Sequence, residues 1–321
     1  MKRTVVTGGA GFIGSHLAEE LASRGYYVVI LDDLSTGRTE NIEVLLQNKD
    51  VQFVQGSITN LPLLHKLFQG VESVFHQAAI PSVPRSIENP LLSHEVNVTG
   101  TLNVLLAARD NHVKKVIYAS SSSVYGDTPT LPKREDMPPN PQSPYAVTKL
   151  AGEYYCRAFQ EVYGLPSVCL RYFNVYGPRQ DPNSQYAAVI PRFISRVSQG
   201  EPPVIYGDGE QTRDFTFVRD AVEANILAAE SEATGVFNTG RGEKISINQL
   251  AELIITLAGS NLKPVHSTPR PGDIGHSLAD ISKAKAFGYT PRYDLEQGLR
   301  KLLLCLLREK TTNAGIRKQN P

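Results

Sequence analysis

The chain has 321 residues, of which 41% are hydrophobic and 20% are charged, values typical of an ordinary globular protein. Its length predicts one large domain with a smaller second lobe. The formal net charge is +1 and there is no long basic run, so the composition does not indicate nucleic-acid binding. The longest apolar stretch, 302–307, is too short to cross a bilayer.

The three cysteines, Cys156, Cys169 and Cys305, lie far apart along the chain. An odd number of widely spaced cysteines favours buried thiols in a reducing compartment over a disulfide set or a metal site. The apolar run that follows Met1 is too short for a signal peptide. We therefore expect a cytoplasmic protein without a metal, a nucleic-acid partner or a membrane partner.

Short β-branched runs alternate with helical patterns through the first half of the chain. Strands are expected at 3–7, 26–32, 51–55, 73–77, 116–120 and 168–172, and they are nearly all apolar, as strands buried on both faces are. Helices are expected at 13–24, 61–68, 91–111 and 145–163. This order requires right-handed crossovers and a parallel sheet. The predicted fold is α/β, a Rossmann-type doubly wound parallel sheet with a smaller, mixed α/β lobe.

Turn-forming residues mark the ends of these elements. Asn89 and Ser143 are expected helix N-caps, because each precedes a proline at the first helical turn, and Gly164 follows the last of the four helices. Six prolines between 129 and 144 predict a stiff loop. After Tyr176 the pattern becomes irregular. We therefore assign 1–175 to the first domain, with a return of 214–240 to it, and 176–321 to the second lobe.

A glycine-rich segment follows the first expected strand. Gly8, Gly11 and Gly14 are spaced G-x-x-G-x-x-G, one position away from the standard dinucleotide fingerprint. Such glycines permit a tight turn, close approach of the backbone to a pyrophosphate, and close packing of helix on strand. Asp32 ends the second strand about 20 residues later, where a carboxylate binds ribose hydroxyls and repels a 2′-phosphate. The segment favours NAD over NADP; the alternative is a structural turn with a solvated aspartate.

Tyr145 and Lys149 are four residues apart on an expected helix and so share one face. A free tyrosine ionises near pH ~10, but a neighbouring ammonium and a positive nicotinamide both favour the phenolate. The two residues are therefore a candidate general acid–base pair, and a surface pair is the alternative. The serine run 120–123 at the end of the fifth strand favours catalysis, because catalytic groups gather at strand carboxyl ends in such sheets.

Together these motifs resemble the extended short-chain dehydrogenase/reductases, over nearly the whole chain. The resemblance is carried by the glycine loop, the serine run before Val-Tyr-Gly-Asp at 124–127, Tyr145 with Lys149, and Leu-Arg-Tyr-Phe-Asn-Val-Tyr-Gly at 170–177. It is closest to the UDP-N-acetylglucosamine 4-epimerases, near relatives of the UDP-glucose 4-epimerases. The resemblance implies bound NAD, a UDP-sugar substrate, and reversible 4-epimerisation of UDP-GlcNAc and UDP-GalNAc by transient oxidation at C4.

The resemblance also implies the roles of individual residues. Ser121, Tyr145 and Lys149 are the implied catalytic residues, as hydroxyl partner, base and ribose-binding cation. The implied cofactor site consists of Gly8, Gly11, Phe12, Ile13, Gly14, Asp32, Asp33, Ser35, Thr36, Gly37, Ser57, Ile58, Gln77, Ala78, Ala79, Tyr145, Lys149 and Tyr172. The implied substrate site consists of Ser82, Val83, Arg85, Ser121, Ser122, Ser123, Asn174, Ala188, Val189, Tyr206, Gln211, Arg213, Arg270, Asp273 and Ser277. Since the family usually has an acid where this chain has Ser57, we expect weaker recognition of adenine without loss of NAD.

The identity of the sugar rests on Ser277, because relatives that reject N-acetyl sugars carry a bulky tyrosine at the matching position. The serine run supplies no carboxylate next to the catalytic hydroxyl, which disfavours a dehydratase. Four readings stay open beside the favoured one: added activity on UDP-glucose and UDP-galactose, a UDP-glucose 4-epimerase with little N-acetyl activity, another UDP-sugar epimerase or decarboxylase, and a non-catalytic dinucleotide sensor. By analogy with the family, the helices 91–111 and 145–163 pair across a two-fold axis in a homodimer.

Overall fold

The computed structural model describes residues 1–181, 188–269 and 274–317. Within these residues a central sheet of seven strands runs through the larger part of the molecule, in the order β11-β6-β5-β4-β1-β2-β3. Every neighbouring pair in it is parallel, which confirms the predicted doubly wound fold. Its strands are β1 (Arg3–Thr7), β2 (Tyr27–Asp32), β3 (Val51–Gln55), β4 (Ser73–His76), β5 (Lys115–Ser121), β6 (Ser167–Tyr172) and β11 (Gly235–Thr239).

The strand order reverses between β1 and β4, which lie side by side with Thr7 opposite His76. Two connections leave this point in opposite directions, so a crevice forms beyond the carboxyl ends of the strands. The six expected strands are all present, with ends within one residue of the prediction, because a fully apolar run between turn residues is a strong local signal.

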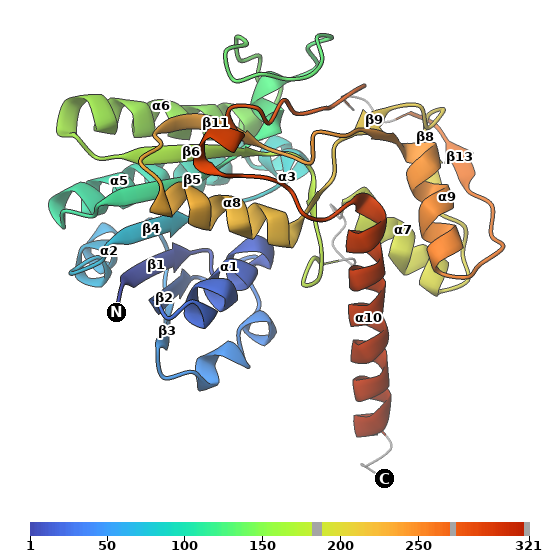
Figure 1. The fold of residues 1–321 in the computed structure, drawn as a ribbon, viewed down its shortest axis with the longest axis horizontal. Coiled ribbons are helices and arrows are strands. Elements are labelled where there is room, and N and C mark those ends of the chain that lie inside the picture. Colours follow the sequence, from blue (N-terminus) through green and yellow to red (C-terminus); the bar gives the residue numbers. More distant parts are fainter. Residues whose placement is uncertain (182–187, 270–273, 318–321) are drawn as a thin grey trace.

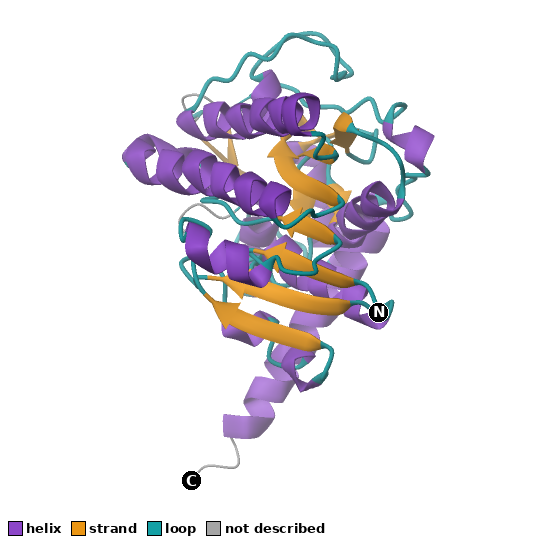
Figure 2. Cartoon of the chain, turned by 90° about the vertical axis from the view of Figure 1, so that its left-hand side faces the viewer, coloured by secondary structure: helices purple, strands orange, loops and turns teal. Residues whose placement is uncertain are grey.

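Helices cover both faces of the sheet. The helices α1 (Phe12–Ser23) and α8 (Val218–Glu230) pack on one face, and α2 (Leu61–Leu67), α5 (Gly100–Asp110) and α6 (Pro144–Tyr163) pack on the other (Figure 1). Viewed from the side, the strands form one twisted layer between helices (Figure 2). A Cβ on Gly152 of α6 would lie 2.2 Å from the hydroxyl of Tyr118 on β5, so glycine is needed for this close contact.

The prediction of a single helix at 91–111 is wrong in detail. The structure has α3 (Val83–Glu88), α4 (Pro90–His94), a π-helical turn η3 (Glu95–Thr99) and then α5. The turn carries the buried Asn97, whose amide bonds both backbone groups of Ile80 and the hydroxyl of Thr148. These tertiary hydrogen bonds accompany the break in the regular i→i−4 pattern of backbone hydrogen bonds. The periodicity of apolar residues in the sequence does not reveal such contacts.

The predicted helix caps are confirmed. The Asn89 side chain accepts from the backbone N–H of Leu92, and that of Ser143 accepts from the N–H of Ala146. Gly164 ends α6 in the left-handed conformation. The remaining single turns of helix are η1 (Thr39–Asn41), η2 (Leu45–Gln47), η4 (Ser122–Tyr125) and η5 (Ala284–Phe287).

A second group of elements lies beyond the carboxyl edge of the sheet, at the right of Figure 1. It has its own apolar core, which includes Phe193, Leu250 and Leu299. Its elements are β7 (Val175–Tyr176), α7 (Val189–Ser198), β8 (Val204–Tyr206), β9 (Thr212–Arg213), β10 (Thr216–Phe217), β12 (Ile245–Ser246), α9 (Ile247–Leu257), β13 (Val265–Ser267) and α10 (Leu295–Arg317). Between these segments the chain returns to the central sheet through α8 and β11. The boundary at residue 175 stays a prediction.

Two of the three thiols are buried as expected, Cys156 and Cys169. Cys305 is partly exposed, so its expected burial is wrong, because it lies on α10, which extends away from the rest of the molecule (Figure 1). None of the helices in the described ranges is long and apolar enough to cross a bilayer. The cytoplasmic location stays a prediction.

Candidate active site

The glycine loop between β1 and α1 is closed by contacts that only glycine permits. Gly8 has a φ of +66°, and a Cβ there would lie 2.7 Å from the backbone N of Ala78 in the loop after β4. A Cβ on Gly14 would lie 2.1 Å from the carbonyl oxygen of Gly8. The start of α1 is thereby packed on the glycine loop, and the loop on the segment after β4, so that the glycine backbone is free of side chains, as a pyrophosphate cradle requires.

A cavity of about 360 Å³ extends from this loop to the start of α6. Sixteen of the eighteen predicted cofactor residues line it: Gly8, Gly11, Phe12, Ile13, Gly14, Asp32, Asp33, Ser35, Thr36, Ile58, Gln77, Ala78, Ala79, Tyr145, Lys149 and Tyr172. Gly37 and Ser57 do not line it. Gly37 packs against the Asp32 carboxylate, and the Ser57 hydroxyl is engaged by Thr59, 2.9 Å from its Oγ1.

Asp32 is buried at the end of β2, where its carboxylate joins the two loops around the cofactor cavity. One oxygen accepts the N–H of Ala10 and the other that of Leu34, each at 2.9 Å. Burial raises the pKa of Asp32, and these two hydrogen bonds oppose the rise. The N–H of Gly11 is a third hydrogen-bond donor to this carboxylate. A carboxylate has about four acceptor positions, so one acceptor remains for a ribose hydroxyl. The geometry fits an adenosine ribose without a 2′-phosphate.

Tyr145, Lys149 and Ser121 come together where the carboxyl end of β5 meets the first turns of α6. The Nζ of Lys149 donates to the carbonyl oxygen of Ala119 at 2.7 Å and lies 5.9 Å from the centre of the Tyr145 ring. Burial lowers the pKa of Lys149 to about 8. Burial raises the pKa of Tyr145, and its hydrogen bond with Ser121 lowers it. The predicted pair therefore shares one face, on which Lys149 is buried and Tyr145 is half-buried, and it is not a surface pair.

Three side chains form a polar cluster at the wall of the cavity, two of which, Gln77 and Tyr172, line it. The Tyr172 hydroxyl lies within 3.1 Å of the amides of both Gln77 and Asn225. Asn225 comes from α8 and was not identified from the sequence, because a single asparagine inside a helix carries no motif. The cluster fixes the Tyr172 ring, which lines the cavity.

A second cavity, of about 260 Å³, lies in the smaller lobe and is lined by six predicted substrate residues: Asn174, Ala188, Val189, Tyr206, Gln211 and Arg213. Arg192, which the sequence reasoning missed, also lines it and lies over the Tyr206 ring at 5.2 Å. The feature that could have identified Arg192 from the sequence is its position on α7, one helical turn after Val189. Cationic and aromatic groups of this kind suit a nucleoside diphosphate.

The other predicted substrate residues are distributed differently. Ser82 and Arg85 line the first cavity. Ser121, Ser122 and Ser123 form the end of β5 and the following turn and, like Val83 and Ser277, line neither cavity. Ser277 is buried, with its N–H donated to the carbonyl oxygen of Thr212, next to Arg213. Arg270 and Asp273 lie outside the described residues.

One wall of the first cavity was not predicted as part of the cofactor site. Arg38, after β2, forms an ion pair with Asp181 at 2.6 Å, and both residues line the cavity together with Arg179. Arg179 pairs with Glu19 on α1 at 2.7 Å. The segment 178–181 thereby closes over the glycine loop. Ion pairs between segments so distant in sequence have no sequence signal.

Comparisons with known proteins agree with this geometry. A structure of UDP-N-acetylglucosamine 4-epimerase from Methanobrevibacter ruminantium M1, in complex with UDP-N-acetylmuramic acid, is 44% identical, with a TM-score of 0.92 over 96% of this chain and 99% of that one. A putative UDP-glucose 4-epimerase of Methanocaldococcus jannaschii is 40% identical over 93% of this chain and 96% of its own length. A UDP-N-acetyl-alpha-D-glucosaminuronate decarboxylase of Bacillus cytotoxicus is 39% identical over 94% and 97%.

The names of these relatives differ in the sugar and in the reaction that they state. Residues 4–240, which span the glycine loop, the Tyr145–Lys149 pair and the central sheet except for Arg3, match one family description. The chain belongs to the NAD dependent epimerase/dehydratase family.

Proposed function

We propose that the protein is an NAD-dependent 4-epimerase that interconverts UDP-N-acetylglucosamine and UDP-N-acetylgalactosamine. The observation that carries the proposal is the cluster of Ser121, Tyr145 and the buried Lys149 beside the cavity that begins at the glycine loop. A tyrosine, an ammonium and a hydroxyl at this place form an acid–base site next to a dinucleotide.

The residues present fit NAD. Gly8 and Gly14 leave the backbone open to a pyrophosphate, and Asp32 is placed for the adenosine ribose. Lys149 is placed for the ribose of the nicotinamide half, beside Tyr145. When bound, NAD supplies reversible acceptance of a hydride from C4 of the sugar.

The chain's own residues move the proton and hold the substrate. Tyr145, as a phenolate stabilised by the Lys149 ammonium, takes the proton of the sugar 4-hydroxyl as C4 loses its hydride, and Ser121 orients the reacting oxygen. The resulting 4-keto sugar turns over while Arg213 and its neighbours keep hold of the UDP. Tyr145 then returns the proton to the 4-oxygen of the turned sugar, so that a 4-hydroxyl of the opposite configuration forms. Atoms and electrons balance, so no net oxidation occurs.

The sugar is assigned from the size of residue 277. The family resemblance puts residue 277 at the sugar, where a serine would leave more room for an acetamido group than a tyrosine. The structural relative from Methanobrevibacter ruminantium carries N-acetylglucosamine in its name. The Methanocaldococcus jannaschii relative is named for UDP-glucose, which supports a second candidate, a UDP-glucose 4-epimerase with little N-acetyl activity. Decarboxylation is less well supported, because the serine turn after β5 places no carboxylate beside Tyr145.

We also propose a homodimer formed through α4 and α6. Apolar side chains are exposed along these two helices: Leu91, Leu92, Val147, Tyr154, Val162 and Tyr163. A row of this kind on neighbouring helices favours a protein–protein contact. Light scattering is expected to give twice the chain mass, and Val147→Glu to give the mass of one chain. A wild-type protein at monomer mass contradicts the proposal.

The test of function uses purified protein without added cofactor, incubated separately with UDP-GlcNAc and UDP-glucose and followed by proton NMR. Formation of UDP-GalNAc is expected. Conversion of UDP-glucose alone keeps 4-epimerisation and refutes the assignment of the sugar. If neither substrate reacts, even with NAD supplied, the proposal fails.

A further inference from the structure

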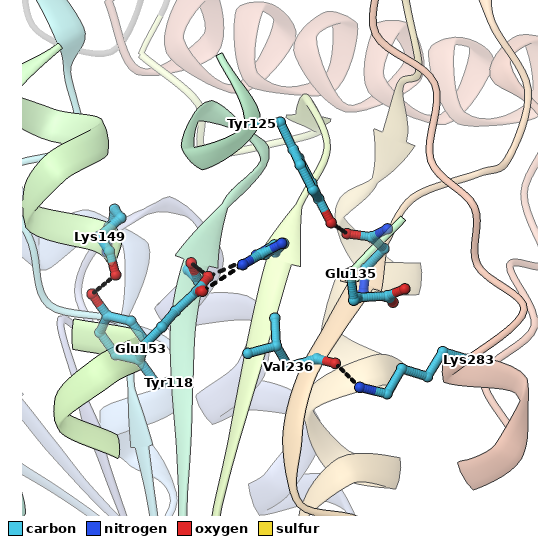
Figure 3. A network of polar contacts seen from close by, with 10 residues as sticks. Tyr118, Tyr125, Glu135, Lys149, Glu153, Val236 and Lys283 are labelled. Atoms are coloured by element: carbon cyan, nitrogen blue, oxygen red, sulfur yellow. Dashed lines mark hydrogen bonds and ion pairs between the residues drawn. The ribbon is translucent and has the colours of Figure 1, made fainter. Parts of the chain in front are cut away.

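A buried carboxylate lies directly behind the catalytic lysine. Glu153 is one helical turn after Lys149 on α6, and it is 3% exposed. Arg171 of β6 donates to it from Nε at 2.9 Å and from Nη2 at 2.7 Å (Figure 3). Ser120 donates its hydroxyl to the same carboxylate at 2.5 Å. None of the steps described above uses Glu153.

Three contacts join consecutive residues of β5 to successive turns of α6. The Ala119 carbonyl accepts from Lys149, Ser120 donates to Glu153, and Ser121 shares a hydrogen bond with Tyr145. The strand end that carries Ser121 is therefore held against the helix that carries the base at three points. Glu153 supplies the point farthest from the cavity.

We infer that Glu153 is a positioning residue for proton transfer, which fixes the end of β5 through Ser120 and keeps the Lys149 ammonium charged. The inference rests on the proposed function and deepens it. Glu153 lines neither the cofactor cavity nor the one in the smaller lobe, so it acts through its neighbours.

The charges around Lys149 favour this role. Tyr145 shares its helix, the ring of Tyr118 on β5 lies 5.1 Å from Nζ, and His76 of β4 is held neutral because burial lowers its pKa to about 3. Burial alone lowers the pKa of Lys149, and the Glu153 carboxylate raises it. Arg171 carries the opposite charge on the far side of that carboxylate. Loss of the Glu153 charge therefore makes Lys149 a stronger acid.

The first experiment compares kcat/KM against pH for the wild type and Glu153→Gln, with the substrate that the wild type converts. The rate falls at high pH as Lys149 loses its proton, and this limb is expected about one pH unit lower in the variant. The rate constant kcat is expected to fall while KM stays within twofold, because Glu153 does not line the substrate cavities. An unmoved limb in a folded, active variant overturns the inference.

Two further variants separate positioning from support of the fold. Glu153→Gln combined with Arg171→Gln removes the whole buried pair and leaves no unpaired guanidinium. In this double variant, kcat/KM is expected to fall at a pH between the values for the wild type and for the single variant. If the pair were merely structural, kcat/KM would fall at the wild-type pH in any folded protein. Glu161→Gln removes an exposed charge from the same helix and is expected to leave the limb unmoved.

A measurement without turnover keeps this inference distinct from the proposed function. Tyrosine ionisation is followed by absorbance near 295 nm in the protein that keeps Tyr145 and in its Tyr145→Phe variant. The difference between the two titration curves reports the ionisation of Tyr145 alone. In the Glu153→Gln background this ionisation is expected at higher pH, because a neutral Lys149 no longer favours the phenolate. Unchanged ionisation overturns the inference, whereas a wild type that converts no UDP-sugar overturns only the function.

Discussion

The Nδ1 of His76 lies 2.8 Å from the Oγ1 of Thr7, where β4 and β1 meet at the reversal of strand order. The other ring nitrogen lies 2.9 Å from the hydroxyl of Thr101, whose proton is donated to the Asn97 carbonyl. Nε2 must therefore be the donor in this contact. Burial lowers the pKa of His76 to about 3, so the imidazole is neutral and Nδ1 accepts from Thr7. This buried ring joins both loops of the cofactor site to α5.

The stability of the protein is expected to fall between pH 7 and pH 5 because of His76. Its pKa is about 3 in the folded state against 6.5 in the unfolded state, so the unfolded chain takes up a proton first as the pH falls. The stabilising contribution is complete above pH ~6.5 and decreases by about 2 kcal/mol at pH 5.

The check is urea unfolding of the wild type and of His76→Gln at both pH values. The variant is expected to lose about 2 kcal/mol less than the wild type between pH 7 and pH 5. His16, whose pKa burial lowers to about 4, contributes equally to both proteins and cancels in the difference. Equal losses would show that His76 is protonated in the folded state.

Replacement of the base is expected to abolish turnover without loss of the cofactor. Tyr145→Phe removes the phenolic oxygen and keeps the ring packing, so kcat should fall by roughly 10²–10⁴-fold. Cofactor content, measured after denaturation, should match the wild type, because Gly8, Gly14 and Asp32 are unchanged. Near-normal turnover by this variant would exclude Tyr145 as the acid–base group.

Asp32→Asn is expected to weaken retention of NAD. The substitution replaces charge-assisted hydrogen bonds with neutral ones, a loss of about 1.5 kcal/mol and so of roughly tenfold in affinity. It also removes the repulsion of a 2′-phosphate, so the ratio of NADP to NAD affinity should rise. Both affinities are measurable by calorimetry on protein stripped of cofactor. An unchanged ratio would mean that the carboxylate does not face the ribose.

Ser277→Tyr tests the assignment of the sugar. The buried serine hydroxymethyl group becomes a phenol, which should exclude the acetamido group and lower kcat/KM for UDP-GlcNAc far more than for UDP-glucose. Ser277→Ala serves as the matched control and should leave the ratio of the two substrates near the wild-type value. A parallel loss of both substrates in the tyrosine variant would refute the size argument.

Features encoded in short segments were predictable from the sequence. The glycine loop, the buried strands and the caps at Asn89 and Ser143 each depend on residues within one turn, and the structure has them as expected. Features that need distant partners were not predictable. The π-helical turn around Asn97 and the ion pair of Arg38 with Asp181 arise from tertiary contacts.

Glu153 is an intermediate case. Its spacing from Lys149 places it on the same helix face, which the sequence does show. Its burial and its pairing with Arg171 depend on how β6 lies beside β5, and only the folded chain shows that.

The proposed mechanism depends on transient oxidation at C4 by a cofactor that the protein retains. The most direct test is to run the conversion of UDP-GlcNAc in D₂O with purified protein and to analyse the product by proton NMR and mass spectrometry. The product is expected to be UDP-GalNAc that carries hydrogen, not deuterium, at C4, because the hydride never exchanges with solvent. Deuterium at C4 would contradict it, because the proton would then have come from water.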